Sequence, residues 1–221
     1  EFVAAVSALA DRVRSKEAQE YLKLSEKKYN LTSEFMKHVA ECLDFEAFIL
    51  GTIESRKLID DLLNPESPEQ KKIVEITGEE LEKRTRKQML STLKYVTLDH
   101  QKDKIIASVD VEKIHARNEY PRTGKIIGKL QDNLINNKQL NPNKKPVITL
   151  GLSREGINFR CSVELEKFDV NEIIALIEKK LPESQVNGGG HRVAGSIKFI
   201  EASYEEVMGI VKEYLKTKVC A

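Results

Sequence analysis

The spacing of apolar residues changes at about residue 96 of this 221-residue chain, and that change limits the folds it can adopt. Up to about residue 95, apolar side chains recur at helical spacing, whereas later stretches alternate apolar and polar residues. The first pattern is typical of amphipathic helices and the second of half-buried strands. The sequence therefore predicts a helical arm over residues 1–95. A small α/β domain, with a mixed sheet and flanking helices, is expected over residues 96–221.

Two start signals predict the longest helices of the arm. Thr32 or Ser33 is an N-cap candidate for a helix that is expected to end before Gly51. The sequence Ser-Pro-Glu at residues 67–69 combines an oxygen cap, a proline at the first helical position and an early carboxylate. The helix that starts there is expected to run to about Tyr95.

Short alternating stretches predict the sheet of the second domain. Strands are expected at roughly residues 96–111, 147–163 and 194–200. The sequence Ser-Arg-Glu-Gly at residues 153–156 predicts a hairpin loop within the second stretch. Pro121, Gly124 and Gly128 predict a loop that leads into a helix through Leu134, and further helices are expected at about residues 169–180 and 203–216.

The charge balance excludes a protein whose whole surface attracts polyanions. The chain has 36 Lys and Arg against 35 Asp and Glu, which gives a formal net charge of +1. So small a charge gives no overall attraction to nucleic acid. Any nucleic-acid interface must therefore be a local patch.

Cysteine usage and hydropathy favour an intracellular, cytoplasmic chain. Cys42, Cys161 and Cys220 are odd in number and too scattered for a zinc site, which favours reduced thiols. No apolar run approaches the ~20 residues that a membrane span needs, and no signal peptide is visible. The chain starts at Glu1 without an initiator methionine, so we expect it to be a piece of a longer protein.

The sequence Gly188, Gly189, Gly190, His191 and Arg192 is the strongest candidate for a binding site. Consecutive glycines between a helix and a strand predict a bare turn whose amides converge as a nest for an anion. The cationic side chains of His191 and Arg192 would complete a phosphate site. The alternative is a flexible helix-to-strand connection with a surface histidine.

Arg160 is a second candidate for the same site. It lies in a predicted strand, so the side chains of Asn158, Arg160 and Ser162 would share one face. A guanidinium has five donors in a fixed fork that suits phosphate oxygens. The alternative is an edge-strand arginine paired to Glu164 or Glu166, and the residues alone leave both open.

His115, Arg122 and Lys125 form a second basic cluster in the sequence. It is either a secondary contact for a nucleic-acid backbone or ordinary solvated charge. No metal site and no catalytic residue is predicted, because the histidines lack acidic partners at metal-ligand spacing; Asp99-His100, for example, is followed by Gln101.

Together, the strand arginine, the helix opening Asp-Val-Asn-Glu-Ile at residues 169–173 and the Gly-Gly-Gly-His sequence resemble the DHH-associated domain. This domain is the C-terminal half of the DHH phosphoesterase superfamily, which includes the single-strand exonuclease RecJ. The resemblance implies that Arg160, the three glycines and His191 hold the phosphates of a nucleic acid.

Two further stretches resemble archaeal RecJ-like proteins. Residues 8–12 are similar to the end of a DHH domain. The sequence Tyr-Pro-Arg-Thr-Gly-Lys-Ile-Ile-Gly at residues 120–128 is similar to a Tyr-Pro-x-x-Gly-Lys-x-x-Gly stretch of those proteins. The resemblance implies a non-catalytic, nucleoid-associated module that binds single-stranded DNA. Its implied partners in replication are GINS and the MCM replicative helicase.

The metal-binding motifs of the DHH family are missing from this sequence. The Asp-His-His triplet and the other manganese ligands belong to the N-terminal domain of the family, so no cofactor is expected in this chain and Mn²⁺ only in a longer parent. The alternative function is therefore the substrate-binding half of a manganese-dependent, single-strand-specific 5′–3′ exonuclease, whose catalytic domain lies outside these residues.

Overall fold

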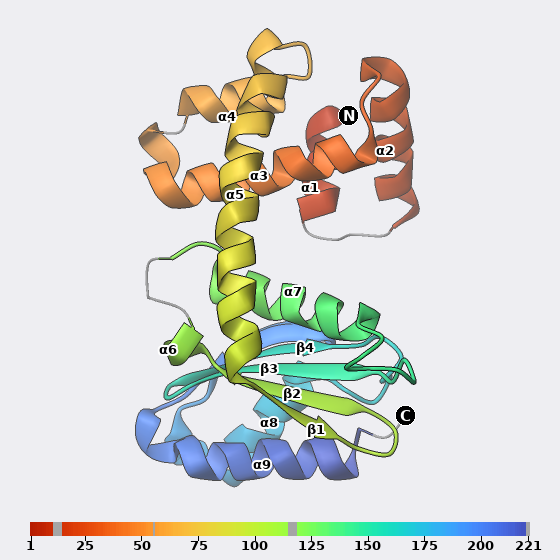
Figure 1. Ribbon diagram of the computed structural model, residues 1–221. Coiled ribbons are helices and arrows are strands. Elements are labelled where there is room, and N and C mark those ends of the chain that lie inside the picture. The colour runs from red at the N-terminus through yellow and green to blue at the C-terminus, as the bar shows by residue number, and fades with distance from the viewer. Residues whose placement is uncertain (11–14, 55, 115–118, 220–221) are drawn as a thin grey trace. The chain divides into compact units, whose positions relative to one another are not determined.

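The computed structural model describes residues 1–10, 15–54, 56–114 and 119–219. Its elements confirm the predicted class, which is helices followed by a mixed sheet with flanking helices (Figure 1). The chain divides into two compact units, Glu1–Arg86 and Lys87–Ala221. The division falls inside a long helix, upstream of the boundary expected after residue 95.

The first unit is helical. Its elements are α1 (Phe2–Ala10), α2 (Lys16–Tyr29), α3 (Ser33–Glu54), α4 (Arg56–Leu63) and the larger part of α5 (Pro68–Tyr95). Their apolar faces meet in a core that includes Phe2, Met36, Val39, Leu62 and Val74. Burial of these faces, rather than helix propensity alone, stabilises these helices.

The predicted helix starts are confirmed, but one predicted end is wrong. The Thr32 hydroxyl accepts a hydrogen bond from the Phe35 amide at 3.1 Å, and α5 begins at Pro68 with the Ser67 hydroxyl accepting from the Glu69 amide at 3.3 Å. Helix α3, however, continues through Gly51 to Glu54. A glycine inside a helix costs only about 1 kcal/mol relative to alanine, so it need not end one.

The second unit contains a six-stranded sheet in the order β1-β2-β3-β4-β6-β5. Strands β2 and β3 pair in parallel, and all the other neighbours are antiparallel. The strands are β1 (Val96–His100), β2 (Ile105–Asp110), β3 (Val147–Ser153), β4 (Gly156–Cys161), β5 (Asn187–His191) and β6 (Ala194–Lys198). The predicted hairpin loop is confirmed, since Arg154 and Glu155 connect β3 to β4.

Helices cover the two faces of this sheet differently. The helices of the second unit are α6 (Val111–Ile114), α7 (Thr123–Asn136), α8 (Val170–Lys180) and α9 (Tyr204–Thr217), with short 3-10 turns at Pro182–Ser184 and Glu201–Ser203. Helix α7 lies on one face and packs on β3 and β4, whereas α8 and α9 lie on the other (Figure 1). Helix α6 packs beside α7 on β3, but His191, Ser196 and Lys198 remain exposed, so the face that carries α7 is covered only in part.

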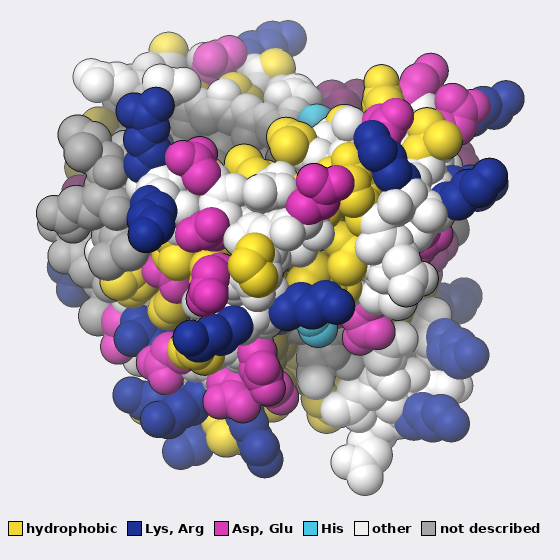
Figure 2. Space-filling model, turned by 90° about the horizontal axis from the view of Figure 1, so that it is seen from above, with side chains coloured by type: hydrophobic (Ala, Val, Ile, Leu, Met, Phe, Trp, Pro, Cys, Tyr) yellow, Lys and Arg dark blue, Asp and Glu magenta, His cyan; other side chains and the backbone are white. Residues whose placement is uncertain are grey.

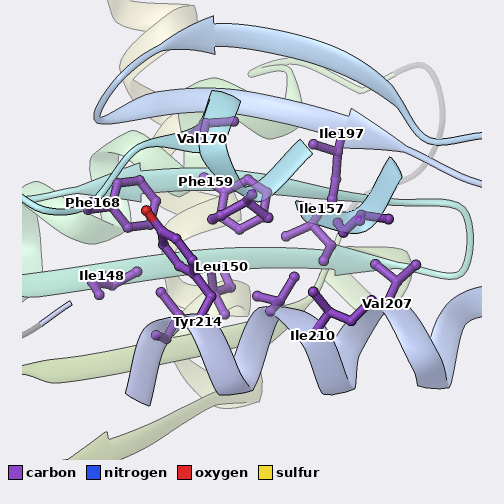
Figure 3. Packing of buried hydrophobic residues seen from close by; sticks show 14 of the residues in the cluster. Ile148, Leu150, Ile157, Phe159, Phe168, Val170, Ile197, Val207, Ile210 and Tyr214 are labelled. Carbon is purple, nitrogen blue, oxygen red and sulfur yellow. The ribbon is translucent and has the colours of Figure 1, made fainter. Parts of the chain in front are cut away.

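Alternation along β4 separates the apolar core from the polar side chains. Phe159 is fully buried and Ile157 nearly so, both in the core beneath α8 and α9, where Figure 3 shows Phe159, Phe168 and Tyr214 close together. Because neighbouring residues of a strand point to opposite faces, Asn158 and Arg160 lie on the α7 side. Ser162, expected on the same face, is buried just beyond β4, and its hydroxyl accepts from the Val147 amide at 2.9 Å.

The prediction that the three glycines form a turn is wrong. They form the centre of β5, an edge strand paired antiparallel with β6, and the turn is made by Arg192 and Val193. All three glycines are extended but at positive φ, between 151° and 155°. Residues that have a side chain rarely adopt this backbone conformation, so glycine is favoured here as it is in a turn. Composition alone therefore does not distinguish a turn after a helix from this unusual strand.

Positive and negative side chains are mixed on the surface. On the face shown in Figure 2, Lys and Arg side chains are interspersed with Asp and Glu side chains. Among the described residues, no helix combines the length and apolar character needed to cross a membrane.

Candidate functional site

Arg160 and His191 lie in one row across the sheet. Arg160 of β4 is opposite Ala194 of β6, and Ala194 is opposite His191 of β5. Residues directly opposite each other in antiparallel strands place their side chains on the same face. The small side chain of Ala194 thus separates the two cationic candidates, on the face that α7 covers only in part. This first row brings together two residues that are 31 positions apart in sequence (191 − 160 = 31).

Two more rows follow along the same face. Asn158 is opposite Ser196, which is opposite Gly189; Gly156 is opposite Lys198, which is opposite Asn187. We call these three rows of β4, β6 and β5 the open face. Its residues are Arg160, Ala194, His191, Asn158, Ser196, Gly189, Gly156, Lys198 and Asn187. None of the nine is an aspartate or glutamate.

The first turn of α7 meets the open face at Arg160. The guanidinium donates from Nη2 to the Gly124 carbonyl at 3.1 Å and from Nη1 to the carbonyl of Phe159 at 2.8 Å. A Cβ atom on Gly124 would lie 3.3 Å from Nη2 and 3.9 Å from Asn158 Oδ1. Glycine at this position therefore lets the arginine lie against the start of the helix.

The start of α7 also contributes positive potential. The first turn of a helix presents amides without intrahelical partners, and the helix dipole favours an anion there. The residue before the helix, Arg122, is exposed and provides no side-chain cap in the described structure. An anion next to Arg160 would thus also lie close to the amino end of α7.

Lys125 is held at this end of the helix by Tyr120. Its Nζ donates to the Tyr120 hydroxyl at 3.1 Å and lies 5.5 Å from the centre of the ring. Tyr120 is only 3% exposed, and the preceding Glu119 bonds to Gln88 at the end of α5. The structure thus places Arg122 and Lys125, two of the three residues of the predicted second patch, at the amino end of α7, where the Gly124 carbonyl accepts from Arg160. The third, His115, lies outside the described residues, as does part of the 8–12 stretch.

The Arg192 side chain faces backbone carbonyls and not the open face. Its guanidinium donates to four backbone carbonyls of the segment after β4, at 2.8 to 3.3 Å; these belong to Val163, Leu165, Glu166 and Phe168. The Arg192 carbonyl also accepts from the Val170 amide at 3.1 Å. These bonds fasten the β5–β6 turn to the segment that leads into α8. The phosphate contact predicted for Arg192 stays a prediction.

Close packing against β6, and not an anion-binding nest, explains why glycine is needed at positions 188 and 190 of β5. A Cβ on Gly188 would lie 2.2 Å from the Ser196 carbonyl oxygen, and one on Gly190 would lie 2.4 Å from that of Ala194. Amides in a paired strand alternate in direction, so they do not converge on one anion, and the nest prediction is wrong. A Cβ on Gly189 would meet nothing within 4 Å. Of the three, Gly189 alone leaves open space.

The buried thiols are not suited to nucleophilic chemistry. Burial raises the pKa of the Cys161 thiol, next to Arg160, to about 12, and it does the same for Cys42. The thiolate, which is the reactive form, is therefore scarce at neutral pH. In the part of the chain that the structure describes, no group of three or more His, Cys, Asp or Glu is arranged to hold a metal ion.

Sequence reasoning missed Gly124, Ser196 and Lys198. Alternation along β6 contained the signal for Ser196 and Lys198, because Ile197 between them is apolar. Gly124 lies in the stretch that resembles archaeal RecJ-like proteins, but its contact with Arg160 joins segments 36 residues apart, so no local pattern predicts that contact.

No protein-family model matches the chain. An uncharacterized protein of Methanocaldococcus jannaschii is 28% identical over 229 residues, which cover 96% of this chain and 30% of that protein. A solved structure, described as the DHH domain of a member of the s1p family of ribosomal proteins, is 30% identical with a TM-score of 0.87. The match covers 100% of this chain and 50% of the chain in that structure.

RecJ from Thermus thermophilus, solved in complex with Mg²⁺, has the same fold at lower similarity. It is 16% identical with a TM-score of 0.56, over 99% of this chain and 35% of RecJ. The chain thus spans half or less of the length of each of these relatives. Its structural neighbours are DHH-domain proteins, which confirms the resemblance to that group.

Proposed function

We propose that this chain is a non-catalytic module that binds the phosphate backbone of single-stranded DNA on its open face. The observation that carries the proposal is the first row, where Arg160 and His191 flank Ala194 beside the amino end of α7. A planar guanidinium suits phosphate oxygens, and a helix start adds amide donors. The relatives with DHH domains support the assignment.

The charge of the open face supports an anionic ligand. The whole chain is nearly neutral, but the nine residues of the open face include Arg160, His191 and Lys198 and no carboxylate. These nine residues include no Phe, Tyr or Trp, so they provide no run of large rings on which successive bases would stack. Binding should therefore be mainly electrostatic and nearly independent of base sequence.

Arg160→Ala is expected to weaken binding of a single-stranded oligodeoxynucleotide about tenfold, because it removes a charged hydrogen-bond donor. It should also reduce the slope of log affinity against log salt by about 0.7, the value for one single-strand phosphate. Fluorescence anisotropy of a labelled oligonucleotide over a series of KCl concentrations measures both quantities.

Arg154→Ala is the matched control. Arg154 lies in the β3–β4 loop of the same hairpin, where it pairs with Glu112 and Glu201, and its loss changes the net charge equally. Thermal unfolding of both variants checks that each remains folded. If Arg160→Ala and Arg154→Ala change the affinity and the salt slope equally, Arg160 does not contact phosphate and the proposal fails.

A second function is favoured because this chain covers only part of the length of its structural neighbours. It covers 50% of the first DHH-domain structure, so a longer parent would have room for a catalytic domain. The chain would then be the substrate-holding half of a manganese-dependent single-strand exonuclease. Manganese-dependent degradation of single-stranded DNA by the full parent, reduced by Arg160→Ala, would favour the exonuclease. Binding by the parent without degradation would favour the scaffold.

The resemblance to archaeal RecJ-like proteins also suggests GINS and the MCM helicase as partners. Such an association would place the module in DNA replication. Purified GINS mixed with this chain should comigrate with it in gel filtration if the first association exists. Separate elution at micromolar concentrations would count against it.

A further inference from the structure

We propose that the open face is a linear track for several successive phosphates, with Lys198 as its second cationic contact. The inference rests on the proposed function and specifies its ligand: an oligonucleotide backbone that runs along β6, rather than a mononucleotide. Arg160 and His191 would hold the first phosphate. Asn158 and Ser196 would face the middle of the ligand, and Lys198 would hold a later phosphate.

The register of three strands sets the length of the track. Ala194, Ser196 and Lys198 are alternate residues of β6, and each is paired on both sides, with β4 and with β5. Alternate residues of a strand point to the same face. At about 3.3 Å per residue, the first and third rows are about 13 Å apart. That distance exceeds the reach of one phosphate and suits a backbone that carries several.

Burial confirms which face these residues occupy. Ile197, between Ser196 and Lys198, is 1% exposed in the core under α8 and α9. A Cβ on Gly195 would lie 2.9 Å from Val170 Cγ1 at the start of α8. Ser196 and Lys198 are both exposed, on the opposite side from that core. The track is therefore open to solvent along β6.

Lys198 has a different charge environment from the paired lysines of the helices. Lys180 pairs with Glu213 at 2.8 Å, and Lys113 pairs with Asp110 at 3.4 Å. Lys198 has no carboxylate partner within ion-pair distance among the described residues. Its two neighbours in the third row, Gly156 and Asn187, are uncharged. The ammonium group is thus available to an anionic ligand.

The middle row has neutral polar groups and little bulk. The side chains of Asn158 and Ser196 have no hydrogen-bond partner among the residues that the structure describes. On the outer side of Ser196 lies Gly189, where an added Cβ would meet nothing within 4 Å. Small, polar and unobstructed residues allow a sugar-phosphate backbone to approach the sheet closely. The three rows together form one continuous polar surface.

The test compares ligand lengths in Lys198→Ala and Lys212→Ala. Lys212 is an exposed lysine of α9, on the opposite side of the sheet, so Lys212→Ala matches the charge change. A thymidine mononucleotide and an octathymidylate serve as ligands, and affinity is measured by competition against a labelled oligonucleotide. Lys198→Ala should weaken octathymidylate binding roughly threefold to fivefold, as expected for one exposed ion pair. It should lower the salt slope by about 0.7 and leave mononucleotide binding unchanged.

Two results would overturn the inference while leaving the proposed function intact. In the first, Lys198→Ala and Lys212→Ala bind octathymidylate with equal affinity, while Arg160→Ala still binds it more weakly. The other is an equal loss for mononucleotide and octathymidylate, which would mean that Lys198 acts only through long-range charge. If Arg160→Ala also binds normally, the proposed function fails as well. Competition by a polyglutamate peptide as strong as by octathymidylate would identify an acidic protein segment as the ligand instead.

Discussion

Replacing Gly188 by alanine is expected to lower the free energy of unfolding by about 3 kcal/mol or more, through overpacking and backbone strain together. The new Cβ would lie 2.2 Å from the Ser196 carbonyl oxygen and 2.8 Å from the Ile197 Cα. Both are backbone atoms of β6, so relief requires the two strands to separate. Gly188 also has a φ of 155°, which alanine rarely adopts. Urea denaturation followed by circular dichroism measures the change.

Gly189→Ala is the matched control for this prediction. Gly189 has the same φ of 155°, but its added Cβ would meet nothing within 4 Å. It should therefore show the backbone strain alone, about 1 kcal/mol. Equal losses in Gly188→Ala and Gly189→Ala would show that the contact between β5 and β6 is looser than the structure has it.

Arg192→Ala is expected to destabilise the chain by about 3 kcal/mol, because it removes the donor for several carbonyls in a partly buried segment. Four carbonyl oxygens between Val163 and Phe168 lie within 3.3 Å of its guanidinium nitrogens. Leu165 and Phe168, at two of these carbonyls, are themselves fully buried. The unfolding free energy of the variant, from the same denaturant titration, tests the estimate.

Arg192→Lys separates geometry from charge. Lysine keeps the charge but has a compact ammonium that cannot reproduce the planar fork, so most of the stability loss should remain. DNA affinity, measured where both variants are folded, should stay within about twofold of the parent chain, because the guanidinium faces carbonyls and not the open face. A large loss of affinity at unchanged stability would instead make Arg192 a direct phosphate ligand.

Regular elements of this protein could be predicted from the sequence because their signals are local. The Ser67-Pro68-Glu69 start of α5 depends only on neighbouring residues. The same is true of the alternation along β4, which places the side chains of Arg160 and Phe159 on different faces of the sheet. The glycines of β5 carry no such signal. Without side chains they have no periodicity, and composition alone favours a turn.

The rest of the candidate site depends on contacts between distant segments. The carbonyl of Gly124 reaches Arg160 only because α7 packs on β4, and Lys198 joins the site only through the register of β6 with β4. Arg192 was expected beside the glycines because it follows them in sequence. Its side chain turns toward carbonyls of another segment, which no local pattern predicts.

Binding of a nucleic-acid backbone to the open face can be mapped by amide NMR shifts of the ¹⁵N-labelled chain during titration with single-stranded DNA. We expect the largest shifts at Gly124, Arg160, His191 and Ser196, which lie on or beside that face. Amides of α9, including Lys212, should change little because the helix covers the opposite side of the sheet. If the largest shifts occur in α9 or in residues 1–86 and the open face is unchanged, the open face does not bind the DNA.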